Sequence, residues 1–161
     1  MAELMDVRFK ELLLAKKVSD TKSVLMLKEE YFQTMDELKE ACSVKLKTAR
    51  QYYILGRYEI LQCGDVEKLI RKRANFAEEP IYFVNIDEMY DIIKRAHIST
   101  GHGGRDKMVT FLSRYANITR ESIELFKSLC IECQKKRKRA TTKGITVRPI
   151  LSKDFGSRGQ V

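Results

Sequence analysis

The chain has 161 residues, of which 33% are charged and 43% hydrophobic, and its formal net charge at pH 7 is +9. This length and composition fit one or two small globular domains, and no apolar run approaches the roughly 18 residues that a membrane span needs. We therefore expect neither a membrane protein nor a secreted one, and the four cysteines indicate metal binding rather than disulfides.

Two helices are expected within residues 1–47, which we interpret as a helical N-terminal extension. Residues 2–16 place Phe9, Leu12 and Leu13 on one helical face. Ser19 and Asp20 are suitable N-caps for a second helix. The apolar residues of this second helix recur at alternating steps of three and four: Val24, Leu27, Tyr31, Met35, Leu38 and Cys42. We expect this stripe to pack against the first helix.

A small region of mixed structure is expected over residues 48–85. Its first part, residues 48–58, favours a helix. Two short strand-like runs then flank Gly64-Asp65, a pair typical of two-residue hairpin turns. The segment IYFVN at residues 81–85 is a third strand candidate, so we expect a small antiparallel sheet over residues 58–85.

Three further helices are expected within residues 86–136, over residues 87–97, 105–116 and 119–130, the last capped by Thr119. The side chains expected to face inward are Met89, Ile92, Ile93, Ala96, Met108, Phe111, Leu112, Tyr115, Ile123, Phe126 and Leu129. The fold class is therefore mainly α (α+β), with helices around one small hairpin or sheet.

The two histidines of the chain precede a cysteine pair in the pattern His97-x4-His102-x27-Cys130-x2-Cys133. Zinc prefers four tetrahedral nitrogen and sulfur ligands in structural sites. Two cysteines separated by two residues reach one ion from a tight turn. A histidine at a helix end and a second one beyond a glycine-permitted break can turn toward the same point. We therefore predict one structural zinc, which would contribute on the order of 10 kcal/mol to folding.

Simpler interpretations exist for each part of this pattern. His97 alone could be a helix-end histidine bonded to the backbone, and His102 a loop residue. The cysteine pair alone could be redox-active, although no thioredoxin-like strand precedes it. The combination of both pairs favours zinc. The remaining cysteines, Cys42 and Cys63, lie in apolar patterns and are expected in the core.

Together with the basic stretch that follows it, this pattern resembles the HHCC zinc-binding domain of retroviral and gypsy-type retrotransposon integrases. The segment from Tyr90 to Arg139 is similar to the version in integrase-like transposon proteins and their host-adopted relatives, among them vertebrate KRAB-A-domain and SCAN-domain proteins. RQYYILGRYEILQCGDVEKLIRKR and ILSKDFGSRGQV also resemble that group. The resemblance covers residues 48–161 and is most specific over residues 86–136.

The resemblance implies that His97, His102, Cys130 and Cys133 bind zinc within a helix-turn-helix-like unit. It also implies a role in DNA-end binding and multimer assembly. In the family, catalysis belongs to a following RNase H-like core with three carboxylates, which begins near where this chain stops. We therefore expect no enzyme, but a zinc module separated from its catalytic core, in which residues 137–161 form a basic linker.

The positive charge is concentrated at the C-terminal end of the chain. From Gln134 onward nine basic residues stand against one acid, whereas the first 133 residues carry 22 basic and 21 acidic groups. A basic tail on a neutral body is typical of a polyanion contact or a nuclear import signal. Composition predicts that residues beyond Gln134 are extended or disordered in isolation.

Contacts between the basic residues and DNA phosphates would add salt-sensitive affinity without sequence choice. Base readout would require the helix at residues 119–130 to enter a major groove with Arg120, Ser122 and Lys127, although Glu121 and Glu124 on the same helix would repel phosphates. The predicted nucleic-acid-binding residues are Lys135, Lys136, Arg137, Lys138, Arg139, Arg120 and Lys127.

These features predict a nuclear, otherwise cytoplasmic, DNA-binding module with no membrane partner and no small-molecule substrate. The alternative is a protein-interaction or multimerisation module that forms homo-oligomers through its N-terminal helices. A zinc hydrolase would need an open coordination position, which a four-ligand site lacks. A steep dependence of DNA affinity on salt would favour the first interpretation, and zinc-dependent dimerisation the second.

Overall fold

The computed structural model describes residues 2–20 and 23–137, so the predicted linker beyond Arg137, with Lys138 and Arg139, lies outside the described residues. That part contains seven helices and one two-stranded sheet, which confirms the mainly α (α+β) fold class. The elements in chain order are α1 (Ala2–Ser19), α2 (Lys28–Ser43), α3 (Ala49–Arg57), β1 (Tyr58–Cys63), β2 (Val66–Arg71), α4 (Ile86–Ser99), α5 (Arg105–Phe111), α6 (Arg120–Leu129) and α7 (Ile131–Arg137).

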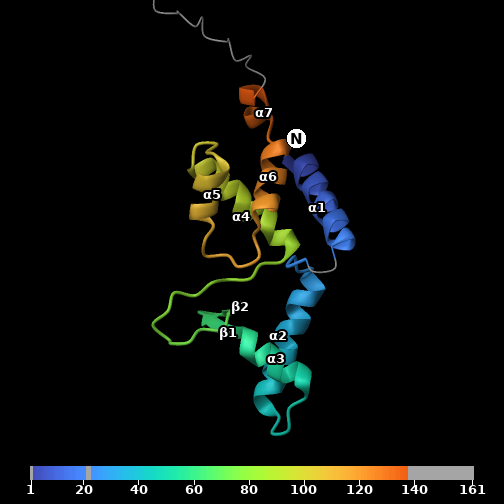
Figure 1. Ribbon diagram of the computed structural model, residues 1–161, viewed down its shortest axis with the longest axis vertical. Coiled ribbons are helices and arrows are strands. Elements are labelled where there is room, and N and C mark those ends of the chain that lie inside the picture. The colour runs from blue at the N-terminus through green and yellow to red at the C-terminus, as the bar shows by residue number, and fades with distance from the viewer. Residues whose placement is uncertain (1, 21–22, 138–161) are drawn as a thin grey trace, which may run out of the picture.

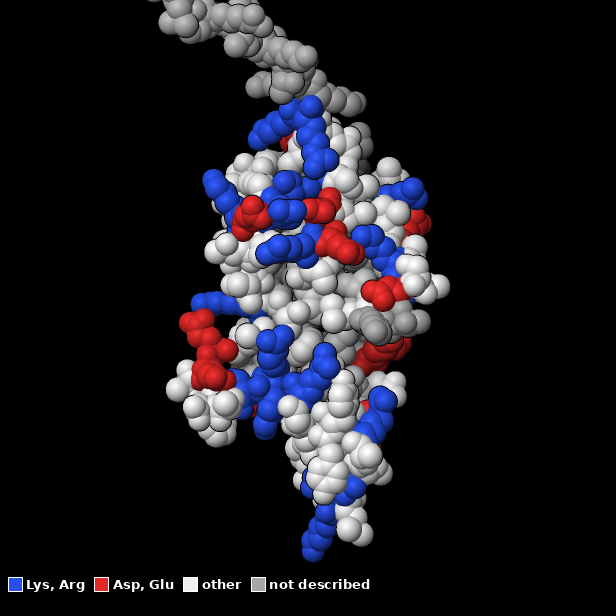
Figure 2. All heavy atoms as spheres, viewed as in Figure 1, with Lys and Arg blue, Asp and Glu red and all other residues white. Residues whose placement is uncertain are grey.

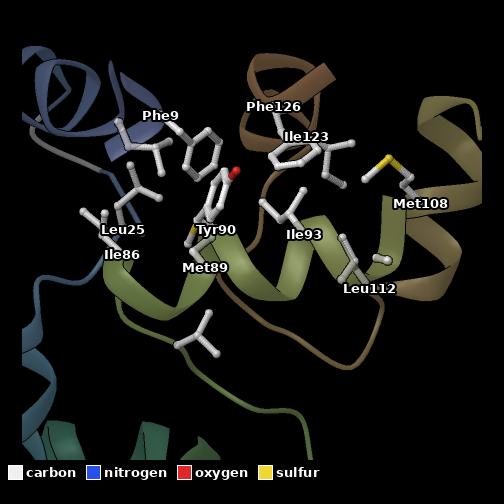
Figure 3. Packing of buried hydrophobic residues seen from close by; sticks show 13 residues of the cluster. Phe9, Leu25, Ile86, Met89, Tyr90, Ile93, Met108, Leu112, Ile123 and Phe126 are labelled. Atoms are coloured by element: carbon white, nitrogen blue, oxygen red, sulfur yellow. The ribbon is translucent and has the colours of Figure 1, made fainter. Parts of the chain in front are cut away.

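The elements gather around two hydrophobic cores at opposite ends of the molecule (Figure 1). The α4 core joins α1, α4, α5 and α6, and Figure 3 shows α4 with its side chains directed at the other three helices. Its buried members are Phe9, Leu13, Leu25, Val84, Ile86, Met89, Tyr90, Ile93, Ala96, Met108, Leu112, Ile123 and Phe126. The hairpin core joins α2, α3 and the hairpin through Tyr31, Met35, Leu38, Ile54, Leu69 and Phe83.

The apolar stripe of α2 therefore packs against α3 and the hairpin, and the prediction that it packs against α1 is wrong. Tyr31 shows the actual partner, because its hydroxyl accepts a hydrogen bond from the backbone N–H of Leu69 at 3.0 Å. Helical periodicity identifies which face of a helix is buried, but it does not identify the element against which that face packs. The four predicted domain ranges stay predictions. Phe9, from the first range, and Phe126, from the third, belong to the same core.

The start of α2 also differs from the prediction. Ser19 ends α1, and α2 begins at Lys28, so Ser19 and Asp20 do not cap it. The cap comes instead from Glu30 in the first turn, whose carboxylate accepts the backbone N–H of Leu27 at 2.9 Å. An acidic side chain at this position satisfies one of the free N–H groups at a helix start, which makes a Ser or Asp cap unnecessary.

The hairpin was predicted correctly, whereas the third strand was not. Cys63 pairs with Val66 across the turn, where Gly64 adopts a φ of +62°. Residues 81–85 make only isolated bridges, because their N–H groups alternate between partners. Phe83 donates to the carbonyl of Leu69 at 2.9 Å, but Tyr82 donates to the carbonyl of Arg114 at 2.7 Å. No continuous ladder forms, and the sheet keeps two strands.

The three helices predicted within residues 86–136 occur as α4, α5 and α6, and some of their ends differ from the prediction. The hydroxyl of Thr119 accepts the N–H of Ser122 at 3.2 Å and caps α6 as expected. Helix α5 ends at Phe111 rather than at residue 116, and the Phe111 side chain is 55% exposed instead of facing inward. Residues 134–137 belong to α7, so the prediction of extended chain beyond Gln134 is wrong for them. Within the described residues, no helix combines the length and the apolar composition that crossing a membrane requires.

Candidate metal centre

Four side chains with metal-binding atoms converge at the end of the α4 core. His97 lies in the last turn of α4, His102 in the turn that follows, Cys130 between α6 and α7, and Cys133 in α7. One candidate ligand atom from each residue lies within 4.8 Å of the other three. The two pairs that the sequence pattern placed together are therefore neighbours in space.

Two of the three short distances between the donor atoms match those around a tetrahedral zinc, and the distance between the two imidazole nitrogens is shorter. His97 Nε2 lies 2.9 Å from His102 Nδ1 and 3.3 Å from Cys133 Sγ, and Cys130 Sγ lies 3.5 Å from His102 Nδ1. A tetrahedral zinc with its usual bonds to nitrogen and sulfur holds its ligand atoms roughly 3.3 to 3.8 Å apart. The cluster is therefore compatible with metal binding.

The turn after α4 directs His102 back toward His97. The hydroxyl of Thr100 donates to the carbonyl of His97 at 3.1 Å, and the N–H of His102 donates to the same carbonyl at 2.9 Å. Gly101 and His102 both adopt positive φ, +62° and +56°. A non-glycine residue rarely adopts this conformation, so the fold holds His102 in a mildly strained position. A Cβ on Gly103 would lie only 2.9 Å from Thr100 Cβ, which explains the second glycine of the turn.

The junction of α6 and α7 presents the two cysteines. The N–H of Cys130 closes α6 on the carbonyl of Phe126 at 3.1 Å. Its own carbonyl accepts the N–H of Gln134 at 3.0 Å and so begins α7. Cys130 is the joint between two helices, and Cys133 lies in the first turn of the second one. Backbone hydrogen bonds on both sides of the joint thus fix the backbone from which the two thiols extend.

Burial changes the pKa values of His97 and Cys133 in ways that bear on metal binding. Burial, then the neighbouring His102 ring and the charges of Lys127 and Lys136, lower the pKa of His97 to about 4. The His97 side chain, which is 2% exposed, is therefore neutral at pH 7, the form that binds metals. Burial, followed by the hydrogen bond with Cys130, raises the pKa of Cys133, so a metal ion would have to displace its proton.

Two further side chains orient His97, and sequence reasoning assigned them only to the core. Met108 Sδ lies 3.3 Å from His97 Nδ1, on the ring atom that faces away from the cluster. The ring of Phe126 lies 5.3 Å from the imidazole at an angle of 70°. A thioether is a weak acceptor, so the usual carboxylate or carbonyl partner of a metal-binding histidine is replaced here by sulfur. No spacing rule in the sequence identifies such a partner.

The predicted nucleic-acid-binding residues are divided between two places. Lys127 and Lys136 are close enough to His97 to affect its pKa, and Lys135 and Arg137 are exposed on α7, where Figure 2 shows blue side chains. Arg120 lies at the opposite end of α6.

The base-reading hypothesis for α6 meets two obstacles. Ser122 is 2% exposed, so the prediction that it reads bases is wrong. Glu121 and Glu124 lie on the exposed side of the helix and form ion pairs with Lys16 at 3.3 Å and Arg105 at 2.9 Å. The outward side of α6 is therefore partly acidic, while its apolar side is covered by neighbouring helices.

The other two cysteines are not core residues. Cys42 and Cys63 are exposed, at the end of α2 and beside the hairpin turn. Both fall near the end of their elements, one residue before the end of α2 and at the last residue of β1, where the chain leaves the hairpin core. The prediction that they are buried is wrong.

Comparison with known proteins reveals a human relative. The chain is 34% identical over 163 aligned residues to human KRAB-A domain-containing protein 2. The alignment covers 99% of this chain but 33% of the human protein, so the chain spans about a third of the length of this curated relative. No family model matches the sequence. No solved structure matches it. The expected likeness to KRAB-A-domain proteins is confirmed, and the wider relationship to integrases stays a prediction.

Proposed function

We propose that this chain is a zinc-dependent nucleic-acid-binding module of integrase origin. The observation that carries this proposal is the buried convergence of two imidazoles and two thiols within 4.8 Å. Nitrogen and sulfur donors in a closed set of four are typical of structural zinc sites. The likeness to human KRAB-A domain-containing protein 2 extends over nearly the whole of this chain, including all four residues of the cluster.

The zinc would be held by His97, His102, Cys130 and Cys133. Bound there, it would supply cross-linking rather than reactivity, because two thiolates balance its charge and no ligand position stays open for water. The end of α4 would be tied to the α6–α7 joint. Since helices of seven to fourteen residues are marginal in water, this tie would contribute much of the stability of the C-terminal helices.

Nucleic-acid binding is supported by the placement of the basic residues relative to this site. Cys133 and the first three residues of the basic run, Lys135, Lys136 and Arg137, share α7. A metal bound to Cys133 would fix the direction of this helix and with it the base of the positive segment. Contacts of these side chains to phosphates would be salt-sensitive and independent of base sequence. We propose a nuclear location for the protein, because the same basic run is typical of a nuclear import signal.

The zinc proposal is tested by native mass spectrometry and far-ultraviolet circular dichroism before and after chelation. We expect one ion per chain, and loss of the ion together with helical signal on chelation or in Cys133→Ser. The matched control is Cys63→Ser, which changes an exposed cysteine and should keep the ion. A folded, metal-free protein whose helical signal ignores the chelator would disprove the proposal.

Nucleic-acid binding is tested by titrating a labelled duplex at several salt concentrations. The triple variant Lys135→Gln, Lys136→Gln and Arg137→Gln should bind more weakly and with a slope smaller by about 2 to 3 in the plot of log affinity against log salt. Absence of binding by the zinc-loaded protein at low salt would contradict the proposal and would favour the second candidate.

That second candidate is a multimerisation module, and one observation favours it. Helix α1 buries Phe9 and Leu13, but it also carries an exposed apolar stripe on its opposite side, formed by Leu4, Val7, Leu14 and Val18. This spacing approximates the seam of a coiled coil. Sedimentation velocity of the zinc-loaded protein tests it, since a dimer that Leu14→Glu converts to monomer would support the candidate and a concentration-independent monomer would contradict it.

A further inference from the structure

A groove with basic walls lies away from the metal centre. It has a volume of about 1100 Å³ and runs between the chain segment before α2, helix α3 and the end of β2. Its cationic lining residues are Lys17, Arg50, Arg57, Arg71 and Lys72, and its acidic ones are Asp20 and Glu30. Figure 2 shows Lys and Arg side chains gathered at the level of α3 and the hairpin.

Three of the cations in the groove have no acidic partner in the part of the chain that the structure describes. Lys17 forms an ion pair with Glu30, and Arg50 holds Glu37 outside the groove at 3.0 Å. Arg57, Arg71 and Lys72 are exposed and form no ion pair there. Since Asp20 also lines the groove, a net positive charge of two faces it. Like charges repel one another, and an anionic ligand would relieve this repulsion.

The register of the hairpin brings these cations together. Arg57 ends α3 immediately before β1, and Lys72 follows β2. Tyr58 pairs with Arg71, and the N–H of Lys72 donates to the carbonyl of Arg57 at 2.9 Å. Residues 57 and 72 are thus neighbours across the open end of the hairpin. The charge cluster is built by backbone pairing and does not depend on flexible side-chain contacts.

An exposed aromatic residue belongs to the same wall. The side chain of Tyr53 is 59% exposed and lies one helical turn before Arg57. The guanidinium of Arg57 lies 5.9 Å from the Tyr53 ring centroid and donates to the Tyr53 hydroxyl at 2.9 Å. A concave basic surface with an accessible aromatic ring is the usual arrangement for binding single-stranded nucleic acid, where phosphates meet the cations and bases stack on the ring.

We propose that this groove binds a single strand of nucleic acid, with Arg57, Arg71 and Lys72 contacting phosphates and Tyr53 stacking on a base. A duplex keeps its bases stacked inside and offers no base face to Tyr53, which favours a single strand. The inference deepens the proposed nucleic-acid function and rests on it for the class of ligand. It adds a second contact surface, distant in sequence from the metal ligands and from the basic run.

The test measures fluorescence anisotropy of a labelled oligothymidylate of about 15 nucleotides, with the zinc-loaded protein. The groove variant combines Arg57→Gln, Arg71→Gln and Lys72→Gln. The charge-matched control neutralises three exposed lysines outside the groove, Lys28, Lys45 and Lys107. The groove variant should bind at least ten-fold more weakly at low salt and lose about 2 from its salt slope, whereas the control should change less than three-fold.

The aromatic contact is tested separately. Tyr53→Ala should weaken binding of the oligonucleotide about ten-fold, Tyr53→Phe should restore it, and Tyr52→Ala, an exposed neighbour outside the groove, should have little effect. Circular dichroism and zinc content verify that each variant is folded. Equal losses in the groove variant and its charge-matched control would overturn the inference, and so would an unchanged affinity in Tyr53→Ala.

The outcomes also separate this inference from the proposed function. If the groove variant binds normally while the variant in residues 135–137 loses binding, the groove inference fails and the proposed function stands. If the unmodified zinc-loaded protein binds neither the oligothymidylate nor a duplex at low salt, both fail. Selective loss of single-strand binding in the groove variant, with duplex binding retained, supports the inference.

Discussion

The ring of Phe126 lies edge-on against the imidazole of His97, with ring centroids 5.3 Å apart and planes at 70°. The same ring contacts Phe9 of α1 at 5.9 Å and Tyr90 of α4 at 5.6 Å. The candidate metal ligand is therefore in contact with the aromatic centre of the α4 core, and α1 is one residue removed from it. Figure 3 shows Phe9, Tyr90 and Phe126 at this centre. Core packing and metal binding should consequently respond to the same substitutions.

Replacing Phe126 should weaken both. Phe126→Leu should reduce the free energy of unfolding by about 1–2 kcal/mol, because it removes the ring contacts while keeping an apolar side chain. Zinc affinity should fall by up to about ten-fold, since His97 loses a wall that orients it. Thermal unfolding and competition with a chromogenic chelator measure the two effects. Phe111→Leu is the matched control, and an equal effect there would show that the Phe126 contact is immaterial.

Replacing Phe9 tests whether α1 belongs to the metal-bearing core. Phe9→Ala empties a fully buried position and should cost about 3–5 kcal/mol, measured by urea unfolding of the zinc-loaded protein. Val7→Ala on the exposed face of the same helix should cost less than about 1 kcal/mol. Similar small costs for both would mean that α1 is dispensable for this core.

The thioether of Met108 should act on the metal site through His97. Met108→Leu conserves volume, so we expect less than about 1.5 kcal/mol of destabilisation. The variant removes the weak acceptor at His97 Nδ1, and zinc affinity should fall by about ten-fold, at the lower end for partners of metal-binding histidines. Met108→Gln restores an acceptor, so a lower affinity than in Met108→Leu would argue against this role.

Asn117 should be among the most sensitive polar positions. It is fully buried, and its side-chain oxygen accepts the N–H of Val84 at 3.0 Å while its amide donates to the Val84 carbonyl. Asn117→Ala leaves two buried backbone groups without partners and should cost about 2–4 kcal/mol. Chemical unfolding checks this, with the exposed Asn75→Ala as control. A cost below about 1 kcal/mol would indicate that water replaces the amide.

The ion pair of Glu59 and Arg73 should make stability depend on pH in a defined direction. Hydrogen bonds from the Arg73 guanidinium, at 2.8 Å, and from its backbone N–H lower the pKa of Glu59 below its usual value of 4.5. Because the pKa is lower in the folded state, the stabilisation is present above pH 4.5 and is lost as pH falls through the folded-state value.

The pair is partly exposed, so its contribution is about 1 kcal/mol. Glu59→Gln should therefore destabilise the protein by about that amount at pH 7 and by much less at pH 3. Urea unfolding at both pH values provides the measurement. A difference that is the same at both values would show that the effect of the substitution is not electrostatic.

The sequence was sufficient for the metal cluster because its ligands form two short-range pairs, each positioned by local backbone. His97 and His102 need only a helix end and a turn, and Cys130 and Cys133 need only a helix junction. What determines their environment is long-range. Met108 and Phe126 reach His97 from two other helices, and nothing in their spacing distinguishes them from ordinary core residues.

The predictions that failed were those that depended on which elements of the fold pack against each other. The stripe containing Tyr31 and Met35 was correctly expected to be buried, but its partner is the hairpin core. The basic groove was missed for the same reason, since Arg57 and Lys72 become neighbours only through hairpin register. Phe111 shows a related limit, because α5 ends at this residue and turns it outward.

The extended segment at residues 83–85 and the first residue of α4 carry side chains of both cores, with Phe83 in the hairpin core and Val84 and Ile86 in the α4 core. Successive side chains of an extended chain point to opposite sides, so this stretch separates the two cores. A shift of its backbone would move side chains of both cores. Deleting one residue here would turn each apolar side chain that precedes the deletion toward the opposite core. A change in the length of this segment would therefore disturb both cores at once.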